Sequence, residues 1–372
     1  MEYRKMKHGE KVSLLGFGCM RFPMKADGSI DEEQAREMME LAIQQGVNYI
    51  DTAYPYHNGD SEPFVGRVLK NYDRSSLYLA TKLPMFKIKE LREAEAIFEE
   101  QLMRLDTDYF DFYLLHAMDK ERWEIVKQQH IMEYLEEQQR NGRIKNLGFS
   151  FHDEYKVFED IINYRDWDFC QIQYNYIDRD IQAGDKGYEL CKEKGVPMVV
   201  MEPIKGGNLA LLPVDIAQEF KKERPNDSVS SWALRWVGSH DNVRVILSGM
   251  SGMDQVKDNL KTFSSFEALS DREKELVAHV ADRIHSRTRN GCTGCQYCMP
   301  CPFGINIPGN FKLWNEYARY GNATSIKTKL AGMKEEEKAQ FCKKCGRCEE
   351  LCPQHITIRK DLDKLHEELG KL

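Results

Sequence analysis

The sequence predicts an α/β protein, a closed (β/α)8 TIM barrel followed by a small α-helical domain that is rich in cysteine. Two observations predict this fold. Between residues 11 and 265, short β-branched or apolar runs alternate eight times with longer helical patterns. Eight βα units in roughly 260 residues are typical of a closed parallel barrel. Eight of the eleven cysteines then lie in the last 81 residues, after the last of these units.

The elements follow one another in a regular order. The expected strands are residues 13–18, 47–51, 77–82, 110–116, 144–150, 169–173, 196–201 and 243–248. The expected helices are residues 31–45, 61–69, 89–105, 121–141, 153–163, 185–194, 228–237 and 254–263. An open doubly wound sheet is the alternative. Its Gly-rich dinucleotide turn is absent after the first strand, where only Gly16 and Gly18 occur.

A further helical pattern at residues 271–287 leads from the barrel into the cysteine region. We therefore expect a barrel domain at residues 1–286 and a second domain at residues 287–372. The two cysteine runs are separated by 40 residues, and segments 310–320 and 335–341 have compositions that suit helices better than strands. The second domain is thus expected to be helical.

Composition excludes several classes of function. The chain has 53 Lys and Arg against 60 Asp and Glu, a net charge of -7, which argues against general affinity for nucleic acid. No apolar stretch approaches the length that spans a bilayer. The first residues, MEYRKMKHGEK, contain no apolar segment of a signal peptide. We therefore expect small-molecule chemistry in a reducing cytoplasm.

The cysteines of the second domain occur in two runs with a spacing that favours iron-sulfur clusters. Each run has three cysteines separated by two residues and ends in Cys-Pro: Cys292, Cys295, Cys298 and Cys301, then Cys342, Cys345, Cys348 and Cys352. Three thiolates at this spacing and a remote fourth can hold a 4Fe-4S cluster, and in two-cluster ferredoxins the fourth cysteine serves the other cluster. We therefore expect one cluster on Cys292, Cys295, Cys298 and Cys352, and another on Cys342, Cys345, Cys348 and Cys301.

The cysteine spacing fits two other kinds of site less well. Zinc sites also use C-x2-C pairs, but these usually occur two by two rather than as triplets followed by Cys-Pro. Disulfides require an oxidising compartment, which the N-terminal sequence does not indicate. The first run also departs from the bacterial pattern, with two residues instead of three before Cys301. Cys19, Cys170 and Cys191 lie in or beside apolar runs and are expected to be buried thiols.

Ionisable residues end three consecutive expected strands. Asp51, Lys82 and His116 stand at the ends of the second, third and fourth strands, and Tyr56 follows Asp51 by five residues. In a parallel barrel the C-terminal ends of the strands form one face, where active sites are found. These four side chains are therefore expected to converge on one catalytic site.

At these positions the sequence resembles the aldo-keto reductases. The segments that carry the resemblance are residues 51–56 (DTAYPY), 80–82 (ATK), 115–116 (LH) and 148–150 (GFS), and it covers roughly residues 10–265. The cysteine region is similar to the C-terminal ferredoxin-type extension of a bacterial subgroup. The resemblance implies an oxidoreductase that reduces a carbonyl to an alcohol, or the reverse, with NAD(H) or NADP(H).

Carbonyl reduction explains the types of residue at the site. Hydride attack builds negative charge on the carbonyl oxygen, which must be stabilised and protonated. Tyr56 is expected to be the general acid in reduction and the general base in oxidation, with Lys82 lowering its pKa. Asp51 would keep the Lys82 ammonium charged, and His116 would polarise the carbonyl. Each residue alone has an ordinary structural explanation, such as a helix cap, a core histidine or a surface ion pair.

The resemblance also implies the residues that contact the nicotinamide cofactor. Ser150 and Gln171 should hold the carboxamide, and the loops at residues 205–207 and 249–251 should hold the pyrophosphate and adenosine. The full expected set is Cys19, Met20, Asp51, Ser150, Gln171, Met201, Gly206, Gly249, Ser251, Gln255 and Asn259.

Three departures from the family pattern bear on the cofactor. Met201 occupies the position at which many family members stack an aromatic ring on the nicotinamide. Phe151 replaces the asparagine that usually follows the serine at the end of the fifth strand. Met250 and Gln255 occupy positions where NADPH-preferring members carry basic residues, so we expect a weak or absent NADPH preference. Substrate contacts are expected from Met20, Tyr54, Met85 and Trp123.

The role of the clusters stays open at this level. A hydride carries two electrons and a cluster passes one, and the sequence has no segment that indicates a flavin site. The clusters could be a structural staple, or an electron port for ferredoxin or another redox partner. The alternative is an electron carrier or redox-complex subunit with a catalytically idle barrel.

Overall fold

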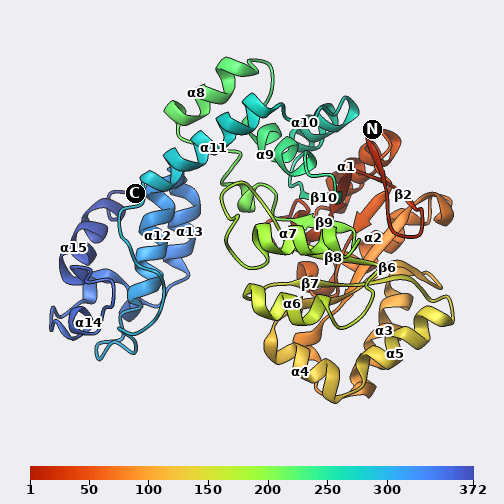
Figure 1. Cartoon of the computed structure of the whole chain (residues 1–372), viewed down its shortest axis with the longest axis horizontal. Coiled ribbons are helices and arrows are strands. Elements are labelled where there is room, and N and C mark those ends of the chain that lie inside the picture. The colour runs from red at the N-terminus through yellow and green to blue at the C-terminus, as the bar shows by residue number, and fades with distance from the viewer. The chain divides into compact units, whose positions relative to one another are not determined.

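The chain forms a closed eight-stranded parallel barrel and a group of C-terminal helices, as expected (Figure 1). The computed structural model describes residues 1–372. The barrel order is β10-β3-β4-β5-β6-β7-β8-β9. Its strands are β3 (Leu15–Gly18), β4 (Tyr49–Asp51), β5 (Tyr78–Leu83), β6 (Phe110–Met118), β7 (Ile144–Phe151), β8 (Phe169–Gln173), β9 (Met198–Met201) and β10 (Val243–Gly249).

The helices that follow these strands lie outside the barrel (Figure 1). They are α1 (Glu32–Gln44), α2 (Ser61–Leu69), α3 (Leu91–Leu105), α4 (Lys120–Gln128), α5 (Ile131–Arg140), α6 (Tyr155–Ile162), α7 (Gly184–Glu193), α9 (Val229–Gly238) and α10 (Met253–Ser264). The expected single helix at 121–141 is wrong, because His130 has a left-handed backbone (φ 54°) that separates α4 from α5.

Large side chains fill the barrel interior. Tyr49, Phe112 and Phe169 are fully buried and belong to one apolar cluster. An antiparallel hairpin of β1 (Tyr3–Lys5) and β2 (Lys11–Ser13) precedes the barrel, and its Met6 and Val12 join the same cluster. Gly16 leaves room for this packing, since a Cβ there would lie 2.6 Å from Val245. Its role in the fold is therefore close packing.

Contacts divide the chain into two units. The first comprises residues 1–206 and 231–271, and the second residues 207–230 and 272–372. The second unit thus takes in α8 (Val214–Glu223), which the sequence analysis missed, and α11 (Asp271–Ser286). These helices are joined by ion pairs of Arg283 with Asp215 (2.7 Å) and Arg224 with Glu273 (2.6 Å). This division differs from the single boundary expected near Ser286, since α8 and α11 group with the later helices.

The rest of the second unit is helical. Its helices are α12 (Ile307–Tyr320), α13 (Ala323–Ala331), α14 (Arg347–Glu350) and α15 (Ile358–Leu369). Phe311, Trp314, Leu362 and Leu365 lie in its apolar core, with Cys352 among them. Residues 335–341 form two short 3-10 turns, η6 and η7, rather than an α-helix. No helix of the chain has the length and apolar character needed to cross a bilayer.

Candidate active site and cysteine cavities

A buried ion pair joins the ends of β4 and β5. Lys82 Nζ donates to Asp51 Oδ1 at 2.7 Å, and the two side chains are 0% and 4% exposed. The ammonium also donates to the carbonyl of Thr52 at 2.7 Å. Removing either partner of such a pair would leave an uncompensated buried charge, which costs about 3–5 kcal/mol. The pair therefore holds both strand ends in place at the C-terminal face of the barrel.

The electrostatics of this pair keep Lys82 cationic. Desolvation lowers the pKa of Lys82, but Asp51 and Tyr56 together raise it above its ordinary value. Desolvation raises the pKa of Asp51, and the Lys82 charge opposes that rise. The ammonium is thus a fixed positive charge at neutral pH.

Tyr56 lies beside this charge in the loop after β4. It begins the short turn η2 (Tyr56–Gly59), in which His57 and Asn58 both have left-handed backbones. Lys82 Nζ lies 5.0 Å from the centroid of the Tyr56 ring. Burial raises the pKa of Tyr56 and Lys82 lowers it, so the expected effect of Lys82 is present but burial is larger. The phenol is therefore protonated at neutral pH, as a proton donor must be.

His116 faces Tyr56 from the end of β6. The ring centroids of Tyr56 and His116 are 6.1 Å apart, and the Phe86 ring lies 5.9 Å from His116. The pairing of β6 with β7 is irregular between Leu115 and Met118, a bulge that redirects the side chains at this point. Burial, followed by the charge of Lys82, puts the pKa of His116 well below its usual range. The imidazole is neutral and offers one N–H.

A polar network lies behind Lys82, and the sequence pattern did not predict it. Glu62 of α2 is fully buried and accepts from Thr81 Oγ1 and Gln101 Nε2, both at 2.6 Å. Gln101 also donates to the Lys82 carbonyl at 3.1 Å. The available signal was a polar residue inside the apolar stripe of α3, where Gln101 lies among Ala94, Phe98, Leu102 and Leu105.

The expected carboxamide contacts have polar atoms suited to that role. Gln171 Oε1 is buried without a hydrogen-bond partner, while its Nε2 donates to Met201 Sδ at 3.5 Å. Ser150 Oγ accepts from the Ala117 backbone N–H at 2.7 Å, which leaves its own hydroxyl proton free to donate. An unpaired buried acceptor beside a free donor fits a carboxamide, which both donates and accepts.

The other expected cofactor contacts lie on the ends of three strands. Cys19 is buried and Met20 is 54% exposed, directly after β3, and Met201 ends β9. Gly206 adopts φ 62° in the short turn η5 (Lys205–Gly207). After β10, where Gly249 is the last residue, polar contacts order the loop: Ser251 N–H donates to Gln255 Oε1 at 2.8 Å, and Asn259 donates to Ser248 Oγ at 2.9 Å.

The substrate contacts expected from the sequence have different environments. Met20 is exposed, but Met85 and Trp123 are 1% and 4% exposed, so both pack within the protein. The Tyr54 hydroxyl donates to Glu100 at 3.0 Å. Only Met20 of the four therefore presents a largely free side chain, while Phe86, 46% exposed and next to His116, was not expected.

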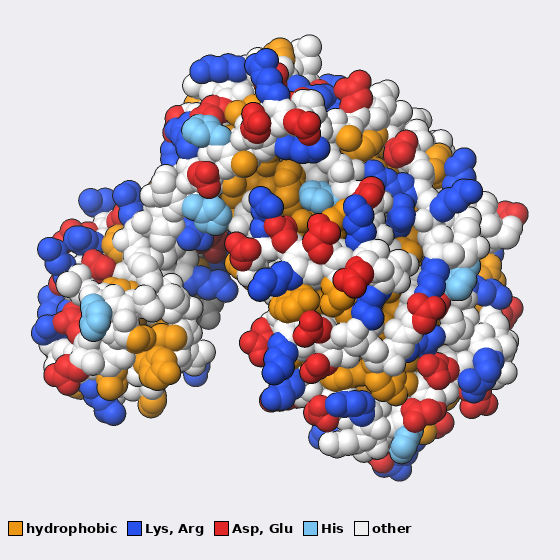
Figure 2. Space-filling view, viewed as in Figure 1, with side chains coloured by type: hydrophobic (Ala, Val, Ile, Leu, Met, Phe, Trp, Pro, Cys, Tyr) orange, Lys and Arg blue, Asp and Glu red, His pale blue; other side chains and the backbone are white.

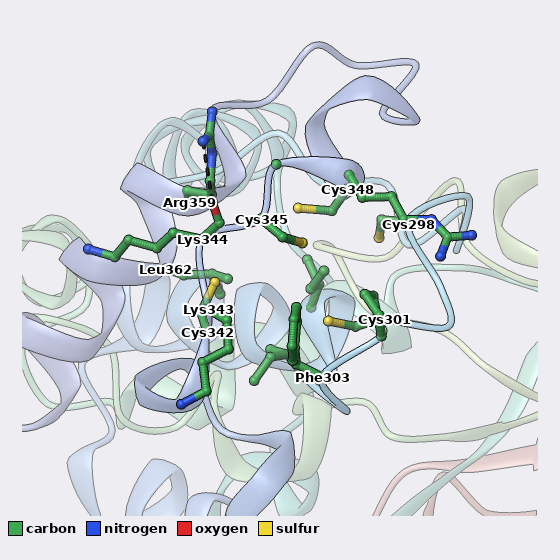
Figure 3. Close-up of a pocket in the computed structure, with 15 residues that line it drawn as sticks. Cys298, Cys301, Phe303, Cys342, Lys343, Lys344, Cys345, Cys348, Arg359 and Leu362 are labelled. Atoms are coloured by element: carbon green, nitrogen blue, oxygen red, sulfur yellow. Dashed lines mark hydrogen bonds between the residues drawn. The ribbon is translucent and has the colours of Figure 1, made fainter.

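The cysteines of the second unit line two cavities. We call the first the basic cavity, because its lining includes Lys343, Lys344, Arg347 and Arg359 with Cys298, Cys301, Cys342, Cys345 and Cys348. Figure 3 shows the sulfur atoms of the labelled cysteines distributed around this space, while Lys343 and Lys344 extend away from it. Burial, followed by the charge of Glu349, raises the pKa of Cys348 to about 11. Its deprotonation by a metal would therefore release a proton.

The second cavity, which we call the neutral cavity, is lined by the cysteines Cys292, Cys295, Cys298 and Cys352. None of its other lining residues is charged. No three of the chain's His, Cys, Asp or Glu side chains gather as tightly as a single metal ion requires. Thiols spread around an apolar hollow suit a larger inorganic group, so the residues present fit a 4Fe-4S cluster in each cavity.

Comparison with protein-family models identifies two regions of the chain. Residues 14–282 match the model described as the aldo/keto reductase family. Residues 291–357 match the model described as a 4Fe-4S dicluster domain. The first match contains all of the strand-end residues at the candidate active site, and the second contains all eight cysteines of the two cavities.

Individual relatives agree with the first match. The NADH-specific methylglyoxal reductase of Escherichia coli is 24% identical over 306 residues, 69% of this chain and 90% of that protein. The holo form of the aldo-keto reductase AKR11C1 from Bacillus halodurans superposes with a TM-score of 0.63 at 27% identity, covering 75% of this chain and 96% of that one. An aldo-keto reductase from Klebsiella pneumoniae in complex with NADPH shares the fold, with 21% identity, a TM-score of 0.63, and coverage of 75% and 95%.

We predict that His116 stays neutral through the ordinary histidine midpoint of about pH 6.5. Its folded pKa is depressed, so below that pH the unfolded chain binds a proton that folded His116 does not, and the protein loses stability as pH falls. NMR of isotopically labelled histidines would detect this, with the His116 signals assigned from a His116→Gln variant. A midpoint at or above 6.5 for His116 would contradict the expectation.

Proposed function

Because the chain belongs to the aldo/keto reductase family, we propose that it interconverts a carbonyl compound and its alcohol with a nicotinamide cofactor. The observation that carries the proposal is the buried Lys82–Asp51 pair beside a protonated Tyr56. The neutral His116 ring lies 6.1 Å from the Tyr56 ring. A proton donor, a fixed cation and a neutral hydrogen-bond donor are the groups that reduction of a carbonyl needs.

Each residue has a distinct part in this reaction. The nicotinamide supplies the hydride when it is bound. Tyr56 donates its hydroxyl proton to the carbonyl oxygen as that oxygen becomes negative, and takes the proton back in the oxidation direction. His116 donates a hydrogen bond to the same oxygen. Lys82 stabilises the tyrosinate that remains, and Asp51 keeps the ammonium aimed at Tyr56.

We propose that Ser150 and Gln171 hold the carboxamide of the nicotinamide. The support is the unpaired Gln171 Oε1 and the free hydroxyl proton of Ser150. The loop at residues 249–251, ordered by Gln255, would hold the phosphates and adenosine with Asn259. Near Gln255 the loop has the buried Met250 rather than a basic residue, which favours NADH. A relative named NADH-specific and a structural neighbour that contains NADPH show that both cofactors occur among similar proteins.

We further propose that residues 287–372 bind two 4Fe-4S clusters. Cys301, Cys342, Cys345 and Cys348 would bind the cluster of the basic cavity, and the cysteines of the neutral cavity would bind the other. Cys298 lines both cavities, and this assignment makes it a ligand of the cluster in the neutral cavity. Five of the cysteines pack against the apolar core that contains Cys352, so the clusters would also stabilise this unit.

The Tyr56→Phe variant tests the proposed reaction. It should lower kcat for carbonyl reduction by about 10²-fold or more, since general acid catalysis contributes about 10²–10⁴-fold. Nucleotide binding, followed by fluorescence, should stay unchanged. The matched control is Tyr78→Phe, which removes a hydroxyl at the opposite end of β5, where it accepts from Lys11 N–H. Near-normal turnover by Tyr56→Phe would contradict the catalytic role of Tyr56. If the parent protein turned over none of a panel of aldehydes and ketones, the alternative of an electron carrier with a catalytically idle barrel would be favoured.

The proposed NADH preference is tested by restoring a basic residue. Gln255→Arg should tighten binding of NADPH by about tenfold through a charge-assisted phosphate contact, with little change for NADH. Isothermal titration calorimetry would measure both dissociation constants. Gln34→Arg is the control, because Gln34 is exposed in the first turn of α1, outside the candidate site. A parent protein that binds NADPH much more tightly than NADH would refute the preference.

Metal analysis tests the cluster assignment. An anaerobic preparation should contain about eight iron and eight sulfide per chain, because two 4Fe-4S clusters are expected. Cys352→Ser should lose about half of both and unfold the second unit at a lower temperature, since Cys352 lies in its core. Cys191→Ser is the control, a buried thiol of the barrel on α7. Zinc in place of iron would overturn the assignment.

A further inference from the structure

The two cysteine cavities differ in charge. Four basic side chains and no acidic one line the basic cavity, whereas no charged side chain lines the neutral cavity. The basic cavity therefore has a positive lining that the neutral cavity lacks. In exposure the two are alike, since each includes one exposed cysteine, Cys345 in the basic cavity and Cys295 in the neutral cavity. A difference in charge between otherwise similar sites favours a difference in the partner that each can approach.

The charge extends to the whole cysteine domain. Residues 287–372 contain 15 Lys and Arg against 10 Asp and Glu, a surplus of positive charge in a chain whose net charge is -7. The remainder of the chain is accordingly strongly acidic. In Figure 2, Lys and Arg side chains gather along the outer edge of the group formed by α12 to α15. Such a field speeds diffusional encounter with molecules of the opposite charge.

Two of the four cations at the basic cavity are free to meet a partner. Arg359 is paired with Glu349 at 2.7 Å, and Lys344 is paired with Asp363 at 2.8 Å. Lys343 and Arg347 are exposed and form no ion pair. Their charge is thus not neutralised within the chain.

Two exposed apolar side chains accompany these cations. Phe303 lines the basic cavity and is 45% exposed, and Phe341, adjacent in sequence to Cys342, is 39% exposed. Apolar contacts surrounded by charges are the composition of protein interfaces, and electron-transfer complexes are small and transient. The combination points to a protein partner rather than a small anion, which would need no aromatic contact.

We propose that an acidic one-electron carrier protein docks over the basic cavity and exchanges electrons with the cluster bound there. Lys343 and Arg347 provide the electrostatic contact and Phe303 the apolar one. In the reducing direction the carrier loses one electron and the cluster gains it, with no bond made and no proton moved. The inference rests on the proposed cluster binding, and it assigns the basic cavity, not the neutral one, as the electron port.

The test follows electron transfer rather than carbonyl turnover. A reduced plant-type 2Fe-2S ferredoxin, an acidic donor, is mixed with the oxidised full-length holoprotein in an anaerobic stopped-flow instrument. The second-order rate constant should fall steeply as salt rises, because screening weakens the attraction. Lys343→Gln/Arg347→Gln should lower the rate constant about tenfold at low salt and flatten its salt dependence.

Three controls separate the explanations. Lys327→Gln/Lys371→Gln makes the same change of net charge at positions that line neither cavity, and should change the rate less than twofold. Iron content and the EPR spectrum after dithionite reduction should match the parent in every variant, which shows that the clusters are intact. Carbonyl reduction with NADH, measured on the same preparations, reports separately on the proposed function of the barrel.

A charge-reversal variant gives the sharpest outcome. Lys343→Glu/Arg347→Glu should slow the acidic donor further, but should accelerate electron transfer from the pre-reduced protein to a basic c-type cytochrome. The docking site would be refuted if the Lys343/Arg347 variants and the control variant had equal rate constants. It would also be refuted if the charge-reversal variant reduced the basic cytochrome no faster than the parent protein does. Intact clusters that accept no electrons from the acidic ferredoxin in the parent protein would refute it as well.

Discussion

The buried pair of Lys82 and Asp51 is the interaction on which the C-terminal face of the barrel depends. Two opposite charges that are almost fully removed from water are stable together and unstable apart. Because they end neighbouring parallel strands, the requirement that they meet also sets the relative height of β4 and β5. Tyr56 and His116 then take positions around a charge that cannot move, while Glu62 and Gln101 brace β5 from behind.

The sequence predicted most of this arrangement, since the signals were local. The sequence alone shows apolar runs that end in Asp51, Lys82 and His116. It also shows the triplets of cysteine at fixed spacing. The break at His130 was not predictable, because no glycine or proline marks its left-handed backbone. The Glu62–Gln101 contact joins residues 39 apart in sequence, and no short segment contains both partners. Helix α8 was missed although it has a local signal, since Pro213 precedes it and its buried Ile216 and Phe220 lie four residues apart.

The difference in charge between the two cysteine cavities could not be predicted from the sequence either, because it depends on contacts between distant residues. The spacing of the cysteines shows which thiols can come together, but it does not show what surrounds them. Arg359 reaches the basic cavity from α15 and pairs with Glu349. Lys344 pairs with Asp363, so Lys343 and Arg347 remain as the uncompensated charges. Composition therefore sets the excess of cations in residues 287–372, and the fold sets which of these cations stay unpaired beside the basic cavity.

The unpaired Gln171 acceptor has a consequence for the energetics of the barrel. A buried polar atom without a partner destabilises the folded chain by about 1–3 kcal/mol. A ligand that supplies the missing donor removes that penalty, so the same free energy appears as affinity for the ligand and as resistance to unfolding. On the proposed assignment of Gln171 to the nicotinamide carboxamide, part of the free energy of cofactor binding would therefore come from pairing this one amide oxygen.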